Sequence, residues 1–171
     1  MSRRFLLILY LAALAMVFCA GLLETTPGYM DADYYYAGAQ LIAAGQGQAE
    51  PYLWNYLNAP DALPAPSFSY WMPLASLVSA AGLCLFPGLG LWGARLPMLF
   101  LAALVPPLTA VLAYRLLRDP AKAKLAGVLA LFPGFYLAYL PTTDVFPLEM
   151  VLGGLFFLVG FAPEEARPGP L

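Results

Sequence analysis

The apolar stretch FLLILYLAALAMVFCAGLL, residues Phe5 to Leu23, decides the fold class of this chain. It contains no charged residue and has about the ~20 residues that an α-helix needs to cross a bilayer. Arg3 and Arg4 precede it, which is typical of a signal-anchor helix that begins in the cytoplasm. The run is long for a signal peptide, and no clear small-x-small cleavage site follows it. We therefore predict a retained first membrane span.

The composition of the whole chain is that of a multi-pass membrane protein. Of its 171 residues, 62% are hydrophobic and only 11% are charged, whereas soluble domains average roughly 25% charged residues. Lys and Arg are absent from Phe5 to Ala94, and without a basic patch we expect no nucleic-acid binding. The chain has no His, so any cofactor metal would be a divalent cation with oxygen ligands.

Hydropathy and charge together predict the topology. We expect four spans, at about residues 5–23, 96–117, 125–140 and 147–161, and an acidic outer loop over 24–69. The segment 70–86 is either a further short span or an interfacial or re-entrant segment. The basic cluster at residues 115–124 favours the second alternative, because a span there would place these cations outside.

These inferences define the expected fold class and location. We predict an all-α integral membrane protein with about four transmembrane helices, outer juxtamembrane helices and one interfacial or re-entrant apolar segment. The membrane module covers residues 1–161, and the Pro-containing residues 162–171 form a disordered tail. The protein would lie in the cell membrane as a multi-pass protein with both termini in the cytoplasm.

The polar segment from Gly28 to Gln40 holds the first candidate chemistry. Asp31 and Asp33 lie two residues apart in a chain with few charges, and carboxylates near a membrane are expensive to desolvate. An extended backbone would place both side chains on one face. Alternatively, Asp33 caps or opens a helix over residues 34–44 while Asp31 faces water.

Five further positions could contact a ligand or each other. Trp54 and Asn55 belong to an aromatic cluster that either stacks on a sugar or lies in the lipid interface. Arg95 begins a span on the predicted outer side, where its guanidinium either binds a phosphate or carboxylate or only snorkels. Asp144 lies in an outer turn, and Glu149 follows it inside an apolar stretch. We expect Arg95 to pair with one of these two carboxylates.

The order of these features resembles the GT-C superfamily of membrane glycosyltransferases. It is most similar to the dolichyl-phosphate-mannose–protein mannosyltransferase group and its bacterial phospholipid-carrier-dependent relatives. The first outer loop carries most of the resemblance, from Met30 to Gln40 with Gly45-Gln46-Gly47. Three other segments resemble the family's aromatic-Pro entry to an apolar segment, the start of its second span and the basic end of that span: Tyr70 to Ala75, Ala94 to Pro97 and Tyr114 to Arg118. Thr143-Asp144 resembles an acidic site at the outer end of a later span. The usual adjacent acidic pair is replaced here by two Asp residues separated by Ala32.

The resemblance implies an inverting glycosyltransferase that moves a sugar from a polyprenyl-phosphate carrier to an acceptor on the outer membrane face. Asp31 or Asp33 would be the general base, and Tyr35, Trp54, Asn55, Arg95 and Asp144 would bind substrate. A divalent cation could offset the phosphate charge. Such enzymes have ten or more spans, so the sequence is expected to be the N-terminal, truncated portion of one, or one part of a split transferase. Its partners would be membrane lipid, the polyprenyl-phosphate sugar and the remaining portion. The alternative is a non-catalytic small membrane scaffold or assembly subunit.

Overall fold

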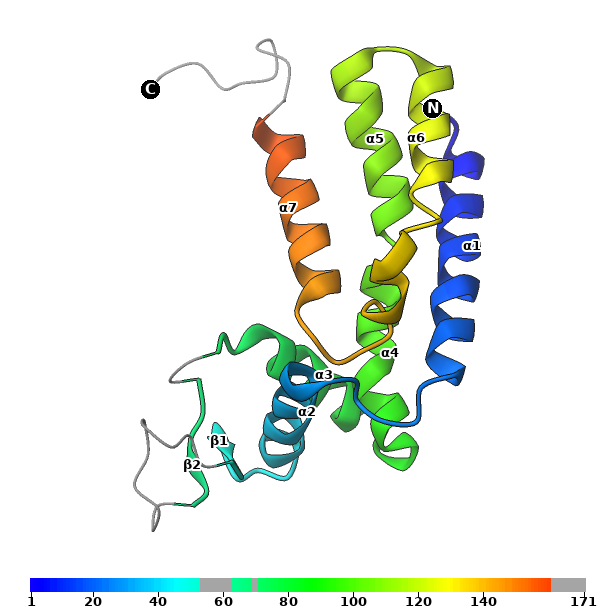
Figure 1. Cartoon of the computed structure of the whole chain (residues 1–171). Coiled ribbons are helices and arrows are strands. Elements are labelled where there is room, and N and C mark those ends of the chain that lie inside the picture. The colour runs from blue at the N-terminus through cyan, green and yellow to red at the C-terminus, as the bar shows by residue number, and fades with distance from the viewer. Residues whose placement is uncertain (53–62, 69–70, 161–171) are drawn as a thin grey trace, which may run out of the picture.

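The computed structural model describes residues 1–52, 63–68 and 71–160, and most of these residues are helical (Figure 1). The predicted α-helical class is therefore confirmed, with a short antiparallel pair of strands, β1 (Ala49–Glu50) and β2 (Ala65–Pro66), as an additional element. The predicted tail 162–171 lies outside the described residues. The α-helices are, in chain order, α1 (Arg3–Leu22), α2 (Met30–Ala43), α3 (Leu74–Leu85), α4 (Leu91–Ala102), α5 (Val105–Leu117), α6 (Pro120–Leu129) and α7 (Phe146–Gly160).

Within the described residues, two helical segments have the length and hydropathy of a membrane span. They are α1, and α4 with α5 taken together as Leu91–Leu117. α3 and α7 are apolar but shorter. The sequence predicted four spans, so the structure supports the coarser statement that the protein has apolar helices long enough to associate with a membrane.

The apolar run 125–140 is not the single helix that the sequence analysis expected. α6 ends at Leu129, and a 3-10 helix, η2 (Gly134–Ala138), follows it. Pro133 has no main-chain N–H and disfavours helical geometry at the residue before it. Gly134 then adopts φ 61°, in the left-handed region. These two residues end the helix and turn the chain.

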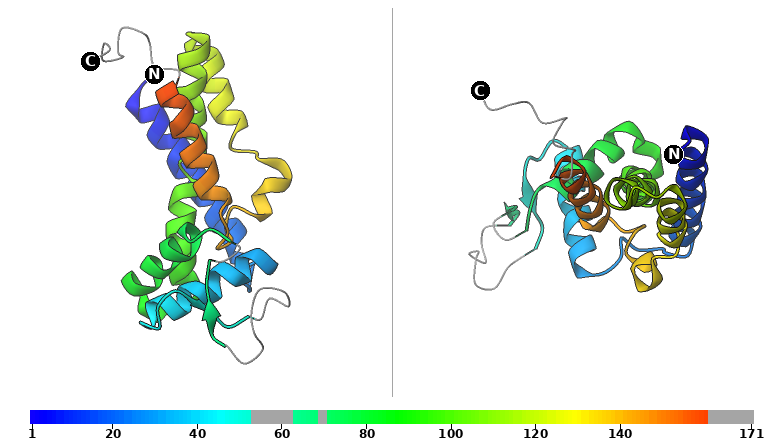
Figure 2. Two further views of the ribbon diagram at one scale, coloured as in Figure 1. Left: turned by 90° about the vertical axis from the view of Figure 1, so that its left-hand side faces the viewer. Right: turned by 90° about the horizontal axis from the view of Figure 1, so that it is seen from above.

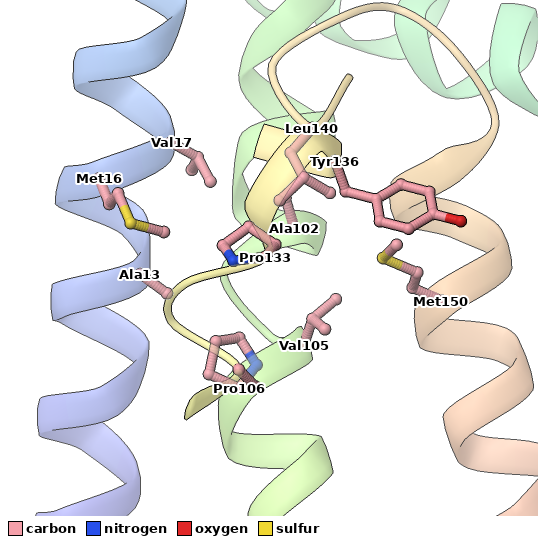
Figure 3. A pocket seen from close by; sticks show the side chains of 11 residues that line it. Ala13, Met16, Val17, Ala102, Val105, Pro106, Pro133, Tyr136, Leu140 and Met150 are labelled. Atoms are coloured by element: carbon pink, nitrogen blue, oxygen red, sulfur yellow. The ribbon is translucent and has the colours of Figure 1, made fainter. Parts of the chain in front are cut away.

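The helix break borders a small apolar pocket, which Figure 3 shows between α1, the α4–α5 junction, η2 and α7. Its volume is about 170 Å³. On the α1 side, Ala13 and Val17 belong to a stripe of residues spaced by four that is buried in the bundle. The remaining lining residues are Met16, Ala102, Val105, Pro106, Ala130, Pro133, Tyr136, Leu140 and Met150.

α2 and α3 pack together at one end of the upright helices (Figures 1 and 2). The small residues Gly38 and Ser76 allow the close approach, because a Cβ on Gly38 would lie 3.1 Å from the Ser76 hydroxyl oxygen. α3 packs in turn on α4, where Gly82 meets the carbonyl of Gly93. The segment 70–86 therefore contributes a helix to this end of the molecule.

Charge separates the two ends of the bundle. The N-terminus, the described end of α7 and the turn between α5 and α6 lie together at one end, opposite α2 and α3 (Figure 1). Arg118 adopts φ 54° at that turn, and Asp119 accepts hydrogen bonds from the N–H groups of Ala121 and Lys122 to begin α6. The basic residues at the N-terminus and at residues 115–124 thus share one end, and the acidic segment 24–50 forms the other.

Candidate functional site

The loop before α7 is buried against the start of α2, although the two segments are far apart in the sequence. The Thr143 hydroxyl donates to the main-chain carbonyl of Ala32 at 2.8 Å, and its N–H donates to the carbonyl of Pro27 at 3.4 Å. Gly28 has φ 142°, and a Cβ there would lie 2.8 Å from Cγ2 of Thr142. Only glycine suits both this conformation and this close contact.

Asp144 lies at the centre of this contact and is only 1% exposed. One carboxylate oxygen accepts from the N–H of Val145, and the other accepts from the hydroxyl of Tyr29. A buried carboxylate needs such donors to remain charged. The structure supplies one donor from its own loop and one from the residue that precedes α2.

Asp31 is the predicted base candidate that lies beside Asp144. Its carboxyl group is partly buried, and its pKa is raised, first by this burial and then by the negative charge of Asp144. Burial is also the main cause of a pKa of about 12 at Tyr35, with further contributions from Asp144, Asp31 and the exposed Glu149. Three acidic groups therefore influence the surroundings of Tyr35.

Asp33 is exposed and points away from this group. The expectation that Asp31 and Asp33 share a face required an extended backbone, and α2 begins at Met30 instead. Residues two apart on an α-helix are separated by about 200° around the axis. Both carboxylates lie in the first turn, where the helix dipole favours negative charge. The structure thus brings Asp31, Tyr35 and Asp144 together without Asp33.

Arg95 does not pair with Asp144 or Glu149, and that expectation is wrong. Its fully buried guanidinium donates to the carbonyls of Gly21 at 3.2 Å, Glu24 at 3.1 Å and Thr26 at 2.6 Å. The Glu24 carboxylate lies 3.8 Å away, and the Trp92 ring lies 5.4 Å from the guanidinium carbon. Arg95 therefore holds the connection between α1 and α2, and binding a phosphate would require it to leave these carbonyls.

A groove lies next to the acidic group, between the α1–α2 connection and the segment 138–142. Its volume is about 390 Å³. Tyr29 lines it and packs edge-on against Tyr139, with ring centres 5.4 Å apart. Burial, followed by the hydrogen bond to Asp144, raises the pKa of Tyr29 far above its ordinary value. A small polar molecule could therefore approach Tyr29 from this side, whereas Asp144 is buried and does not line the groove.

Sequence reasoning missed two polar groups. Tyr29 could have been proposed from the sequence, because it lies next to Asp31 and Asp33, which were already candidates. Glu50 could not, since it is one acidic residue in a polar loop, yet its side chain is 1% exposed. It lies beside Tyr34, whose pKa is raised by burial and then by Glu50.

Two predicted ligand-binding residues, Trp54 and Asn55, lie outside the described residues. Within the described ranges, no three Asp, Glu or Cys side chains come together in a geometry that could hold a metal ion. No reaction step is therefore assigned to the divalent cation that the family resemblance implies.

No family model matches the chain, and no curated protein or solved structure matches it.

Proposed function

We propose that this chain is a membrane module of an inverting glycosyltransferase that moves a sugar from a polyprenyl-phosphate carrier to an acceptor on the outer face. Asp31 is the general base. Asp144 and Tyr35 shape its surroundings, and the partial exposure of Asp31 lets the acceptor reach it. The observation that carries this proposal is the partly buried Asp31, with a raised pKa, beside the buried carboxylate Asp144.

A raised pKa suits a carboxylate that must accept a proton. General bases work best when their pKa lies near the working pH, and burial next to a like charge is a physical route to that value. Asp33, exposed on the same helix, lacks this environment. The proposal therefore assigns the base to one of the two candidates in the first loop.

The proposed step is a single displacement. Asp31 takes the proton from the acceptor's O–H or N–H group, and the freed electron pair forms the bond to the anomeric carbon. The bond between that carbon and the carrier's phosphate oxygen breaks, and its electron pair leaves with polyprenyl phosphate. Attack opposite to the leaving group inverts the anomeric centre.

The arrangement of the helices supports the proposed location. The acidic group lies at the end of the bundle that is opposite to Arg3, Arg4 and the basic α5–α6 turn (Figure 1). The positive-inside rule would place that basic end in the cytoplasm and the acidic end outside. Membrane lipid would surround α1 and the α4–α5 segment, and the carrier would approach from the bilayer. The other spans that the family uses would come from the remaining portion of a split or longer transferase.

The second candidate function is a non-catalytic membrane scaffold or assembly subunit. The observation that favours it is the internal use of polar groups. The two terminal guanidinium nitrogens of Arg95 donate to three carbonyls, and Asp144 accepts from Tyr29 and Val145. On this alternative, these contacts only hold the α1–α2 connection and the loop before α7 together.

One assay separates the two functions. Membranes containing the full chain with its native partners are given a panel of radiolabelled polyprenyl-phosphate hexoses and pentoses, and loss of label from the lipid phase is measured. Asp31→Asn should lower transfer by about 10²-fold or more, while the matched variant Asp33→Asn should retain it. Equal transfer by wild type and Asp31→Asn would remove the base assignment. Absence of transfer by wild type with every donor would favour the scaffold.

A further inference from the structure

Tyr29 joins the segment that carries Asp31 to the loop that carries Asp144 through a side-chain hydrogen bond. It precedes α2 and donates its hydroxyl proton to Asp144, which lies in the loop before α7. Its ring is held edge-on by Tyr139, so the position of the hydroxyl is set by packing. The proposed reaction gives Tyr29 no contact with the reacting atoms.

We infer that Tyr29 is a positioning residue, whose hydroxyl holds the buried Asp144 carboxylate in place beside Asp31 and thereby sets the surroundings of the proposed base. This inference rests on the proposed function for its catalytic meaning. The effect of the Tyr29–Asp144 hydrogen bond on the titration of Asp31 can be tested without an activity assay.

The burial of Asp144 supports this role. Its side chain is almost inaccessible to water, and within the described residues two donors serve it, the Val145 N–H and the Tyr29 hydroxyl. Loss of the phenolic donor would remove the bond that fixes one oxygen of the Asp144 carboxylate, so this group could turn away from Asp31. Asp31 would then lose its negative neighbour and ionise at lower pH.

The other titratable groups around Asp31 do not replace this effect. Tyr35 lies on the same helix, Glu149 approaches from α7, and Tyr139 lies beyond the ring of Tyr29. The pKa of Tyr35, raised by burial to about 12, keeps its phenol neutral at ordinary pH. Asp144 is the neighbouring charge that raises the pKa of Asp31.

The first test is thermodynamic. Thermal unfolding of the full chain in detergent is followed from pH 4 to pH 9, with and without Asp31→Asn, in the wild-type and Tyr29→Phe backgrounds. The pH range over which Asp31→Asn changes the melting temperature reports the titration of Asp31. In the Tyr29→Phe background this range should end about one pH unit lower. Tyr139→Phe, which removes a hydroxyl from the same groove, should leave the range unchanged.

A second variant covers the case in which Tyr29→Phe does not fold. Site-specific replacement of Tyr29 by 3,5-difluorotyrosine keeps the ring and makes the phenol a stronger donor, so the range should end at higher pH. An unchanged range in whichever of these two proteins folds would overturn the inference.

Activity measurements separate this inference from the proposed function. If the assay detects transfer, the acid limb of kcat/KM should move to lower pH in Tyr29→Phe. Loss of transfer in Asp31→Asn with an unmoved limb would overturn the role of Tyr29 and leave the base assignment intact. Full transfer in Asp31→Asn, together with a moved thermal range, would overturn the proposed function and leave the Tyr29–Asp144 coupling intact.

Discussion

The hydroxyl of Thr143 donates a hydrogen bond of 2.8 Å to the main-chain carbonyl of Ala32, and the Thr143 side chain is fully buried. This contact joins the loop before α7 to the first turn of α2. It therefore sets the distance between the two segments that carry Asp144 and Asp31.

Replacing Thr143 by Val should destabilise the protein by about 1–3 kcal/mol, because the shape is kept while a buried carbonyl loses its donor. Thermal unfolding in detergent measures the change. Thr109→Val is the matched control, since the Thr109 hydroxyl bonds to the carbonyl of Val105 within its own helix and is only partly buried. If Thr109→Val lowers the unfolding free energy as much as Thr143→Val does, the long-range contact of Thr143 has no special role.

Arg95→Lys should be strongly destabilising despite keeping the charge. An ammonium group lacks the planar fork that reaches the carbonyls of Gly21, Glu24 and Thr26 together. We expect a loss of about 3 kcal/mol or more in unfolding free energy, because buried acceptors are left without donors.

Arg115→Lys provides the comparison for Arg95→Lys. Among the residues that the structure describes, Arg115 donates to one carbonyl, that of Leu158, and a lysine could replace that bond. We expect a loss below about 1 kcal/mol by denaturant or thermal unfolding. Similar losses in the two variants would show that the three-carbonyl arrangement does not hold the α1–α2 connection.

The effect of Asp31→Asn on stability should depend on pH. The folded pKa of Asp31 is raised, so the folded protein holds this proton to higher pH than the unfolded chain does. The wild-type protein therefore loses stability as the pH rises from the ordinary pKa of an aspartate through the raised pKa of Asp31. Asp31→Asn should raise the melting temperature above that window and have no such advantage below it.

The exposed Asp33 controls for the loss of a carboxylate near the helix N-terminus. Asp33→Asn removes the same charge from the same turn without removing a partly buried group. A melting temperature that rises equally in both variants at high pH would attribute the effect to the helix dipole instead of to burial and Asp144.

Two single cysteines test the proposed orientation. In a chain in which Cys19 and Cys84 are replaced, Lys122→Cys should react with an impermeant maleimide only from the cytoplasmic side, because it lies in the basic turn that begins α6. Gln46→Cys, exposed just after α2, should react only from outside. Reaction of both residues from one side would contradict the arrangement of the two ends.

Much of the helical framework could be predicted from hydropathy and charge. The uninterrupted run after Arg4 forms α1, and the apolar residues after Arg95 belong to the long α4–α5 segment. The expected helix over 125–140 failed where Pro133 and Gly134 interrupt it. Both residues are visible in the sequence, but the prediction followed the mean hydropathy of the run and did not use them.

The candidate site was only partly predictable. Asp31, Tyr35 and Asp144 were expected to contribute, and the structure brings them together. Asp33 was expected equally with Asp31, because spacing alone could not decide between an extended and a helical backbone. Arg95 was expected to meet an acidic side chain across the outer surface, and it binds the carbonyls that follow α1.

The sequence by itself determined the helical class, the long apolar segments and the separation of basic and acidic ends, because these follow from local hydropathy and from the cost of burying charge. Only the tertiary structure decided which aspartate meets Asp144, what Arg95 binds, and that Tyr29 joins the two segments. Those relationships depend on the rotation of α2 about its axis and on contacts between residues 69 to 115 positions apart. A local sequence pattern determines neither the rotation of α2 nor these long-range contacts.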